Sequence, residues 1–434
     1  MELTGWGKYP EIDSEVIKPS STKALLKSLS DNSQRPLIAR GLGRSYGDSS
    51  LAHHVISTVY LDHFLKFDEA AGLLTCSAGV SLADILNVFI PKGWFLSVTP
   101  GTKFVTVGGA IASDVHGKNH HIEGSFSEYI STMKIATVSD GIVECTRELH
   151  PDLFRATCGG MGLTGIVLEA TLKLKPIQSS YINETTIKAQ NLEEALNLFD
   201  AHQNSTYSVA WIDCLATGKS LGRSLVMLGE HAEKGGLKAG KIGKLTVPVD
   251  MPSILLNQYT IQAFNTFYYH RVTKQRSERF AHFESFFYPL DGIHQWNRMY
   301  GKNGFIQYQF VLPKEAGLAG MTSVLKRIAE SKRGSFLAVL KAFGKGNDNF
   351  LSFPLEGYTL ALDFKFDEGL LPLLDELDKI VLEFGGRVYL TKDSRMSEET
   401  FKQSYPQWNE FMEVRKQYGA DQVFHSLQSQ RLGL

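Results

Sequence analysis

The stretch from Pro100 to His121, which reads PGTKFVTVGGAIASDVHGKNHH, constrains the fold of this chain more than any other. Its middle is apolar and contains the pair Gly108–Gly109. Glycine costs a helix or strand about 0.5–1 kcal/mol relative to alanine, so the pair predicts either close backbone approach to a ligand or a turn with positive φ. Protic side chains follow at once, from His116 to His121. The stretch therefore predicts a backbone cradle and a titratable cluster at the floor of a cofactor site.

Length and charge narrow the class of protein. With 434 residues, 43% of them hydrophobic, the chain is longer than single hydrophobic cores usually grow, so at least two domains are expected. Lys and Arg number 45 against 46 for Asp and Glu, which gives a formal charge of −1. This balance supplies no global basic field of the kind that binds nucleic acid, so nucleic acid is not an expected partner.

Cysteine spacing and the N-terminal residues indicate the compartment. The four cysteines form no CxxC pair, which argues against a zinc or iron–sulfur site and against a disulfide scaffold. The opening residues, MELTGWGKYPEID, have neither the basic nor the apolar part of a signal peptide, and no uncharged apolar run approaches the ~20 residues needed to cross a bilayer. We expect a cytoplasmic protein without a bound metal.

Two further glycine-rich loops accompany the opening stretch. Gly41–Asp48 follows a short buried strand expected over 36–40, and Cys158–Gly165 precedes another strand. The first loop has the spacing GxGxxxG instead of GxGxxG and no apolar-periodic helix after it, which disfavours a nicotinamide-binding fold. A phosphate-cradling nest and a plain β-turn both remain open. Three such loops, each entering or leaving a strand, predict a ligand with a long phosphate-bearing backbone.

Helices and strands are expected around these loops. A helix should begin at the Ser20–Thr22 cluster and another should cover 81–92, and 130–138 with 142–145 should form a hairpin. Beyond Pro176 a fresh alternation begins, with a helix over 192–201 and a strand over 207–213. Pro176 therefore marks a domain boundary.

Residues 234–269 combine a basic part with an apolar part. Lys234–Lys244 is rich in lysine and glycine, and Val247–Tyr269 is apolar and aromatic. A basic loop joined to exposed apolar side chains would suit an anionic lipid or a membrane surface. A flexible insertion followed by ordinary core explains the pattern equally well, because a sequence does not show which apolar residues are exposed.

Polar side chains interrupt the strands of the C-terminal half, expected over 305–312, 336–343 and 358–364. Alternation places Gln307 and Gln309 on one face of the first strand, where two amides could hydrogen-bond a sugar. Lys341 lies in an apolar strand, which favours a solvated sheet edge over a catalytic role. A helix over 371–384 and a strand over 388–391 should follow, and Lys392 would lie at the strand end, where α/β sites usually occur.

Seven strings of the sequence carry a family resemblance: RGLGRSYGD, PGTKFVTVGGAIASDVHGKNHHIEGSF, GGMGLTGI, YPLDGIHQWNRMYG, GFIQYQFV, LSFP and FGGRVYLTKDSR. In this order and spacing they resemble the decaprenylphosphoryl-β-D-ribose 2′-oxidase family, a branch of the vanillyl-alcohol-oxidase-like FAD flavoproteins. The resemblance runs from about Gly5 to the C-terminus.

The resemblance implies an α+β fold with FAD as cofactor. A two-subdomain FAD-binding domain of the vanillyl-alcohol-oxidase type would comprise residues 1–176, completed by 388–434, and a substrate-binding domain with an antiparallel sheet would comprise 177–387. The implied FAD contacts are Arg40, Gly41, Leu42, Gly43, Arg44, Ser45, Tyr46, Gly101, Thr102, Val105, Thr106, Gly108, Gly109, Ala112, Ser113, His116, Gly117, Asn119, Gly160, Gly162, Gly165 and Ile166.

The resemblance also implies catalytic and substrate-binding residues. Lys392 would polarise the flavin or substrate oxygen, and Tyr46 and His116 would relay the proton. The implied substrate pocket comprises Lys118, Trp211, Tyr300, Gln307, Gln309, Lys341, Phe343, Thr359 and Ala361.

The activity implied is oxidation of the 2′-hydroxyl of a polyprenylphosphoryl-ribose to the 2-keto sugar, the first half of an epimerisation to the arabinose form. A separate NAD(P)H-dependent ketoreductase would complete it. Two alternatives remain open: oxidation of a soluble sugar, alditol or aldonolactone, and a catalytically silent flavin-binding subunit. A lipid-linked substrate, together with residues 234–269, would place the protein peripherally on the inner face of the plasma membrane.

Two departures from the family pattern affect the chemistry. Gly43-Arg44-Ser45 lacks the histidine that carries the flavin in many covalent members of the wider class, so non-covalent FAD is expected. Ala361 stands where the mycobacterial members have the cysteine that covalent nitroaromatic inhibitors attack, so no such adduct is expected. Thr359 replaces a pocket asparagine, which leaves the identity of the sugar and lipid open.

Overall fold

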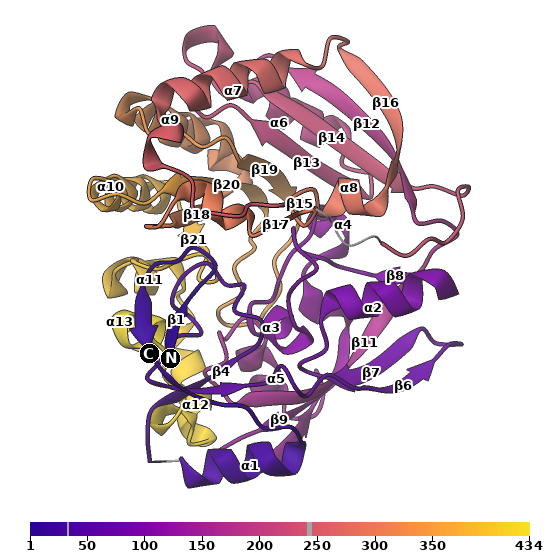
Figure 1. The fold of residues 1–434 in the computed structure, drawn as a ribbon, viewed down its shortest axis with the longest axis vertical. Coiled ribbons are helices and arrows are strands. Elements are labelled where there is room, and N and C mark those ends of the chain that lie inside the picture. The colour runs from indigo at the N-terminus through magenta and orange to yellow at the C-terminus, as the bar shows by residue number, and fades with distance from the viewer. Residues whose placement is uncertain (33, 241–244) are drawn as a thin grey trace.

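The computed structural model describes residues 1–32, 34–240 and 245–434. Figure 1 shows two halves, one above the other. The lower half contains both termini and combines indigo N-terminal segments with yellow C-terminal segments, whereas the upper half is built from the middle of the chain. Segments from both ends of the sequence therefore fold together.

Three sheets form the lower half. Their strands are β1 (Glu2–Thr4), β2 (Glu11–Asp13), β3 (Glu15–Ile17), β4 (Leu37–Arg40), β5 (His54–Ser57), β6 (Phe64–Asp68), β7 (Leu73–Ser77), β8 (Trp94–Leu96), β9 (Ile130–Ala136), β10 (Ile142–Cys145) and β11 (Ile166–Pro176). β1 and β2 pair with each other, and β3-β5-β4 is a small parallel sheet. The largest sheet has the order β10-β9-β11-β7-β6, with β8 paired to β11. The predicted 130–145 hairpin is confirmed by the antiparallel pairing of β9 with β10.

The N-terminal and C-terminal segments also contain the helices α1 (Thr22–Asp31), α2 (Leu82–Phe89), α3 (Val107–Ala112), α4 (His120–Glu123), α5 (Pro151–Thr157), α11 (Glu398–Ser404), α12 (Trp408–Gln417) and α13 (Leu427–Leu432). The two helix starts predicted from the sequence are confirmed, because Ser21 and Ser81 cap α1 and α2 by accepting hydrogen bonds from backbone N–H groups. The C-terminal segment joins the parallel sheet where Leu37 pairs with Phe424.

The upper half is built around an eight-stranded sheet. Its strands are β12 (Tyr181–Ala189), β13 (Tyr207–Ile212), β14 (Ser224–His231), β16 (Arg276–His282), β18 (Phe305–Pro313), β19 (Ala338–Phe343), β20 (Gly357–Lys365) and β21 (Arg387–Val388). They lie in the order β16-β12-β14-β13-β19-β20-β18-β21, and every pair is antiparallel. β15 (Leu245–Thr246) and β17 (Ile293–His294) form a separate parallel pair. The expected antiparallel sheet is confirmed, and the whole is a mixed α/β architecture; the division at residues 177 and 387 stays a prediction.

The two faces of this large sheet have different environments. The helices of this half are α6 (Leu192–Ala201), α7 (Gln258–His270), α8 (Phe283–Phe287), α9 (Gly317–Ser331) and α10 (Leu370–Glu383). Strand residues alternate between faces. In β13, Ala210 and Ile212 point into the core with α6 and α9, whereas Val209 and Trp211 point to the opposite face and line a cavity. In β18 the same alternation places Gln307 and Gln309 together on the cavity face, as predicted.

Three expectations need correction. The pair Gly108–Gly109 lies inside the helix α3, so the predicted turn with positive φ is wrong. A Cβ on Gly108 would come within 3.1 Å of the Ala78 Cβ, and this close packing explains why the residue is small. The strand expected over 388–391 is shorter than predicted, because β21 already ends at Val388. The backbone then turns, and the N–H of Lys392 donates to the carbonyl of Tyr389 at 3.0 Å. The edge strand β6 was not predicted, because its apolar and polar residues do not alternate cleanly.

Candidate active site

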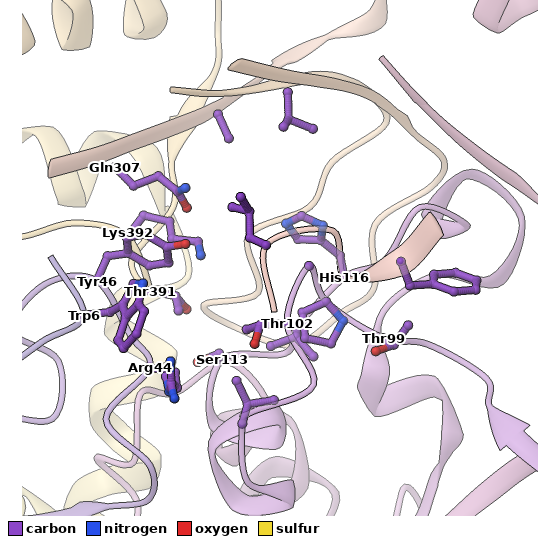
Figure 2. A pocket seen from close by; sticks show the side chains of 18 of the residues that line it. Trp6, Arg44, Tyr46, Thr99, Thr102, Ser113, His116, Gln307, Thr391 and Lys392 are labelled. Carbon is purple, nitrogen blue, oxygen red and sulfur yellow. The ribbon is translucent and has the colours of Figure 1, made fainter. Parts of the chain in front are cut away.

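A cavity of about 820 Å³ lies between the two halves. One end is walled by the three glycine-rich loops of the lower half, over 40–50, 99–113 and 161–167. The other end is walled by the large sheet and by the C-terminal end of α7. Figure 2 shows side chains from both halves around this space. The cavity thus joins a backbone-rich end to a side-chain-rich end.

At the glycine-rich end, Gly41 and Gly43 stand where a side chain would not fit, whereas Gly101 borders open space. A Cβ on Gly41 would lie 2.3 Å from the Thr106 hydroxyl, and Gly43 has φ +63°. A Cβ on Gly101 would instead meet no atom within 4 Å, so this backbone faces the open cavity. Such a surface can hold a long ligand through backbone groups.

Lys392 and Tyr46 form the centre of the site. The Lys392 Nζ lies 3.9 Å from the centroid of the Tyr46 ring, a cation–π contact. The backbone fixes the pair, because the N–H of Tyr46 donates to the carbonyl of Thr391 at 3.1 Å. Figure 2 shows Lys392, Tyr46 and Gln307 close together, with His116 set apart from them in this view. The loop 41–48 and the turn after β21 therefore position one another.

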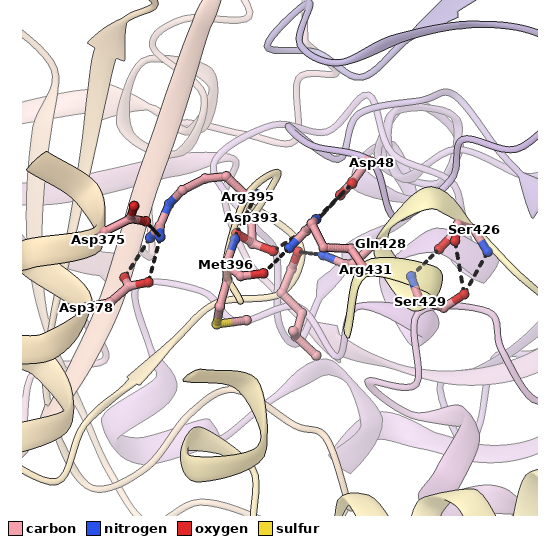
Figure 3. Close-up of polar contacts among 11 residues, drawn as sticks. Asp48, Asp375, Asp378, Asp393, Arg395, Met396, Ser426, Gln428, Ser429 and Arg431 are labelled. Atoms are coloured by element: carbon pink, nitrogen blue, oxygen red, sulfur yellow. Dashed lines mark hydrogen bonds and ion pairs between the residues drawn. The ribbon is translucent and has the colours of Figure 1, made fainter. Parts of the chain in front are cut away.

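A buried ion-pair network holds this turn from behind (Figure 3). Arg431 of α13 donates to Asp48 and to Asp393, in each case at 2.9 Å, and the two carboxylates are almost fully buried. Arg395 pairs with Asp378 of α10 at 2.6 Å. α13 and α10 thus fix the loop that carries Lys392.

Arg431→Ala is expected to lower the free energy of unfolding by about 3 kcal/mol, because it leaves two buried carboxylates without their cation. Thermal unfolding of the purified protein checks this. Lys402→Ala, which removes an exposed pair with Glu398 one helical turn away, is the matched control and should change stability by only about 0.3–0.5 kcal/mol. Equal effects of the two substitutions would contradict the role assigned to Arg431.

His116 is buried and contacts Gln309. The side-chain amide of Gln309 donates to His116 Nε2 at 3.1 Å and to the Thr359 hydroxyl at 3.2 Å. His116 Nδ1 has no partner with hydrogen-bond geometry among the described residues. Burial lowers the pKa of His116 well below its ordinary value, and the cations Lys341 and Lys392 add to this effect. The ring is therefore neutral near pH 7.

Asp363 is a buried carboxyl group that the sequence reasoning missed. It is 1% exposed and accepts a hydrogen bond from Gln307 at 2.5 Å and another from the Tyr300 hydroxyl at 3.5 Å. Burial raises its pKa to about 7, against the opposing effects of Gln307 and Lys392. Its signal in the sequence was an acid inside the apolar strand YTLALDF, the same kind of signal that singled out Lys341.

The side chains of three lysines line this cavity, and their pKa values are lowered. Burial lowers the pKa of Lys392 to about 7, of Lys118 to about 7 and of Lys341 to about 8. The Lys118 Nζ also donates to the carbonyl of Phe286. Lys341 is therefore not solvated at a sheet edge as expected. Buried cations that lose solvation favour an anionic ligand.

Most predicted site residues line the cavity. These are all three catalytic candidates, the substrate candidates Lys118, Trp211, Gln307, Gln309, Lys341, Thr359 and Ala361, and the cofactor candidates Arg40, Gly41, Leu42, Gly43, Arg44, Ser45, Gly101, Thr102, Val105, Thr106, Gly108, Gly109, Ala112, Ser113, Gly162, Gly165 and Ile166.

Five predicted residues lie outside the lining. Tyr300 stacks on Phe305 at 4.3 Å, behind Asp363, and Phe343 packs against the outer side of His116 at 4.6 Å. The other three, Gly117, Asn119 and Gly160, face protein instead: Asn119 donates to the carbonyl of Ser97, and a Cβ on Gly117 or Gly160 would clash with Thr99 or Ala156. These five can support the site without touching a ligand.

Two family models match the chain. One, described as an FAD binding domain, covers residues 14–146, and the other, described as D-arabinono-1,4-lactone oxidase, covers residues 362–432. The chain is also 37% identical to a decaprenylphosphoryl-β-D-ribose oxidase from Mycolicibacterium smegmatis, over 100% of this chain and 97% of that protein. It belongs to the decaprenylphosphoryl-β-D-ribose oxidase family.

More distant relatives of this oxidase act, by their names, on sugar lactones. An L-gulono-1,4-lactone dehydrogenase from Mycobacterium tuberculosis is 20% identical over 96% of both chains, and an L-gulonolactone oxidase from Bos taurus is 26% identical over 45% of this chain and 44% of its own. The protein is an FAD-dependent oxidoreductase that acts on a CH–OH group of a sugar or lactone. In the ranges described, no helix is long and apolar enough to cross a membrane.

The cavity of this oxidase fits FAD on two observations. The glycine-rich end offers a long backbone wall, open at Gly101. The neutral His116 ring leaves Nδ1 without a partner at the junction of the two ends. The loops 40–50, 99–113 and 161–167 would hold the dinucleotide part, and Tyr46, His116 and Lys392 would lie near its reactive ring.

Proposed function

We propose that this oxidase converts the 2′-hydroxyl of a polyprenylphosphoryl-ribose to the 2-keto sugar. The observation that carries the proposal is the joining, in one cavity, of three partly buried lysines and two amides to the glycine-rich end. Lys118 and Lys341 supply charge for a phosphodiester, and Gln307 and Gln309 supply hydrogen bonds for a pentose. The similarity to the Mycolicibacterium smegmatis oxidase supports the same substrate class.

The proposed reaction removes a hydride from C2′ and a proton from its hydroxyl, leaving a carbonyl. FAD, when bound, supplies the hydride acceptor. His116 is kept neutral by its lowered pKa, and it would accept the proton at Nε2, the nitrogen that accepts from Gln309 in this structure, because Nδ1 then carries the ring hydrogen. The Lys392 ammonium stabilises the negative charge that develops on the oxygen. Burial raises the pKa of Tyr46 well above its ordinary value, so its phenol stays protonated and would donate a hydrogen bond to the substrate oxygen.

The decisive experiment adds polyprenylphosphoryl-ribose to the purified holoenzyme under anaerobic conditions and follows the visible flavin absorption band. Bleaching by the lipid-linked pentose, but not by free pentoses, alditols or aldonolactones, is expected. The lactone-oxidase model that matches residues 362–432 favours the competing function. Bleaching by a free sugar or lactone alone would establish that competitor and overturn the proposal.

The product determines the class of the partner enzyme. A 2-keto sugar on a polyprenyl phosphate becomes the arabinose epimer only when a hydride is returned to the opposite face of C2′. An NAD(P)H-dependent ketoreductase would carry out this step. The two activities together would give net epimerisation.

Activity is expected to fall as pH rises through about 7. Burial lowers the pKa of Lys392 to about 7, so the ammonium form is lost above that pH, whereas His116 is already neutral there. Asp363 favours the charged form of Lys392, so Asp363→Asn should move the falling limb to lower pH. Profiles of kcat/KM between about pH 6 and 9 test this.

The exposed-pair variant Asp367→Asn, which loses its contact with Arg333, is the control and should leave the profile unchanged. A rate that rises through about pH 7 would mean that the neutral amine of Lys392 is required. An unmoved limb in Asp363→Asn would show that Asp363 does not position the charge of Lys392.

FAD is expected to be bound without a covalent link. The loop 41–48 carries Gly43, Arg44 and Ser45 and has no imidazole that could form the bond. Precipitation of the holoenzyme with acid should leave a colourless pellet and release the flavin into the supernatant. Flavin that stays with the pellet would contradict this expectation.

A further inference from the structure

Exposed apolar side chains are concentrated in the segment that precedes α7 in the sequence and on α7 itself. Of nineteen large hydrophobic side chains exposed among the described residues, eight lie between residues 245 and 267. We call six of them the α7 platform: Val249, Ile254, Leu255, Tyr259, Phe264 and Phe267. Ile254, Tyr259 and Phe267 are 76%, 78% and 71% exposed. A patch of this kind on a protein surface marks a site of interaction.

Buried polar contacts fix the inner face of α7, so the platform on its opposite side points outward. Asn265 is fully buried and donates to Asp213 at 2.9 Å, and Arg223 donates to the same carboxylate at 2.8 Å. Tyr269 is 7% exposed and its hydroxyl donates to the carbonyl of Ala189. These contacts set the rotation of α7, so Tyr259 and Phe267 cannot turn into the core without breaking buried polar contacts. The earlier alternative, ordinary core, does not describe the outer face.

The charge next to the platform is positive. From Met251 to Ser277 the sequence has no acidic residue. Arg271 and Lys274 are exposed directly after α7, and Arg271 lies over the Tyr268 ring at 3.8 Å. Asp250, at the platform's edge, is neutralised by Lys8 at 2.6 Å. An apolar face with a cationic border complements an anionic lipid headgroup layer. The basic residues of the loop at 241–244 lie outside the described residues.

The cavity of the active site reaches the same helix. Tyr268, Arg271 and Val272 line it at the C-terminal end of α7, and the Tyr268 ring packs on Trp211 at 4.7 Å. Leu225 and Met227 continue this apolar wall towards the sheet. The cavity therefore extends from the glycine-rich end to the border of the platform. Figure 1 shows α7 at the end of the molecule that lies far from both chain termini.

We propose that the α7 platform docks on an anionic bilayer and that the wall of Trp211, Leu225, Met227 and Tyr268 guides the prenyl chain from the bilayer to the sugar site. The proposal rests on the proposed function for its substrate and deepens it. The platform buries its aromatic side chains among acyl chains while Arg271 and Lys274 meet the headgroups. A lipid-linked sugar then reaches the active site without its tail crossing water.

Flotation of the holoenzyme with vesicles tests the docking surface. Vesicles of phosphatidylcholine with phosphatidylglycerol should carry the protein, and vesicles of phosphatidylcholine alone should carry less. The double variant Tyr259→Ser/Phe267→Ser removes two exposed aromatic rings and should weaken partitioning at least ~10-fold. The matched control Tyr60→Ser/Leu65→Ser, which removes exposed side chains far from α7, should float like the wild type. Unchanged flotation of the platform variant would overturn the proposal.

Turnover separates this inference from the proposed function. With a long-chain substrate in anionic vesicles, the platform variant should lose about 10-fold in kcat/KM, whereas a short-chain, water-soluble polyprenylphosphoryl-ribose should be oxidised at the wild-type rate. Oxidation of the short-chain substrate by a wild type that binds no vesicles would overturn the docking surface and leave the function standing. Vesicle binding without bleaching of the flavin by either substrate would overturn the proposed function and leave the docking surface standing. A wild-type dimer that the platform substitutions convert to monomer, without vesicle binding, would assign the surface to a protein partner.

Discussion

Lys392→Ala retains FAD and loses turnover by about 10²-fold or more, as expected for removal of a charge that stabilises a developing alkoxide. The side chain lies against the Tyr46 ring in the cavity and takes no part in the ion-pair network behind it, so its removal should leave the fold intact. Rapid-mixing measurement of flavin bleaching isolates the oxidation step from later steps.

The control for this experiment is Lys345→Ala, which removes an exposed lysine outside the cavity lining. It should keep both FAD content and turnover. A Lys392→Ala enzyme that bleaches as fast as the wild type would remove Lys392 from the mechanism. An enzyme that no longer holds FAD would show that Lys392 serves cofactor binding instead.

Gly47→Ala lowers kcat by about 10²-fold in a protein that still folds, the size of effect that a displacement of about 1 Å in a catalytic group can have. A Cβ on Gly47 would lie 1.8 Å from the carbonyl oxygen of Asp393, so the loop that carries Tyr46 and the turn that carries Lys392 must separate. Neither catalytic side chain is altered. The loss therefore measures how closely the two loops must approach.

Gly292→Ala is the matched control, because the nearest atom to its Cβ is 3.7 Å away and its backbone is not in the left-handed region. Circular dichroism and thermal unfolding report whether the Gly47 variant is folded, and steady-state kinetics report the loss. Full activity of Gly47→Ala would show that the two loops can separate without moving Tyr46 from Lys392.

The regular elements with clear periodicity were predictable from the sequence. α1, α2, α6 and α10 have apolar residues at helical spacing and clear start or stop signals, and the alternation in β18 fixed the common face of Gln307 and Gln309. Features that depend on distant partners were not predictable. The two-residue length of β21 depends on the turn that closes on Tyr389, and the Gly108–Gly109 pair lies in a helix because Thr106 caps it and Ala78 crowds it.

The residues of the candidate site were named mainly through the family resemblance, and the structure adds their environment. Burial of Lys341 could not be inferred from one apolar strand, because it depends on the lower half that covers the sheet. Asp363 was missed for the same reason: its partners Gln307 and Tyr300 lie 56 and 63 residues away in the sequence. The exposure of α7 depends on Asn265 and Asp213, which are 52 residues apart.

The pairing of Asp48 with Arg431 also determines when, during synthesis of the chain, the loop that carries Tyr46 can take its final position. The two residues are 383 positions apart, so the loop that carries Tyr46 leaves the ribosome long before the arginine that holds it. At typical rates of translation the delay is roughly 20–80 s. During that interval the nascent N-terminal segment lacks the turn with Lys392 and the network behind it. Cofactor capture in its final form therefore follows the synthesis of Arg431, and chaperones that shield the early segment should raise the yield of loaded enzyme.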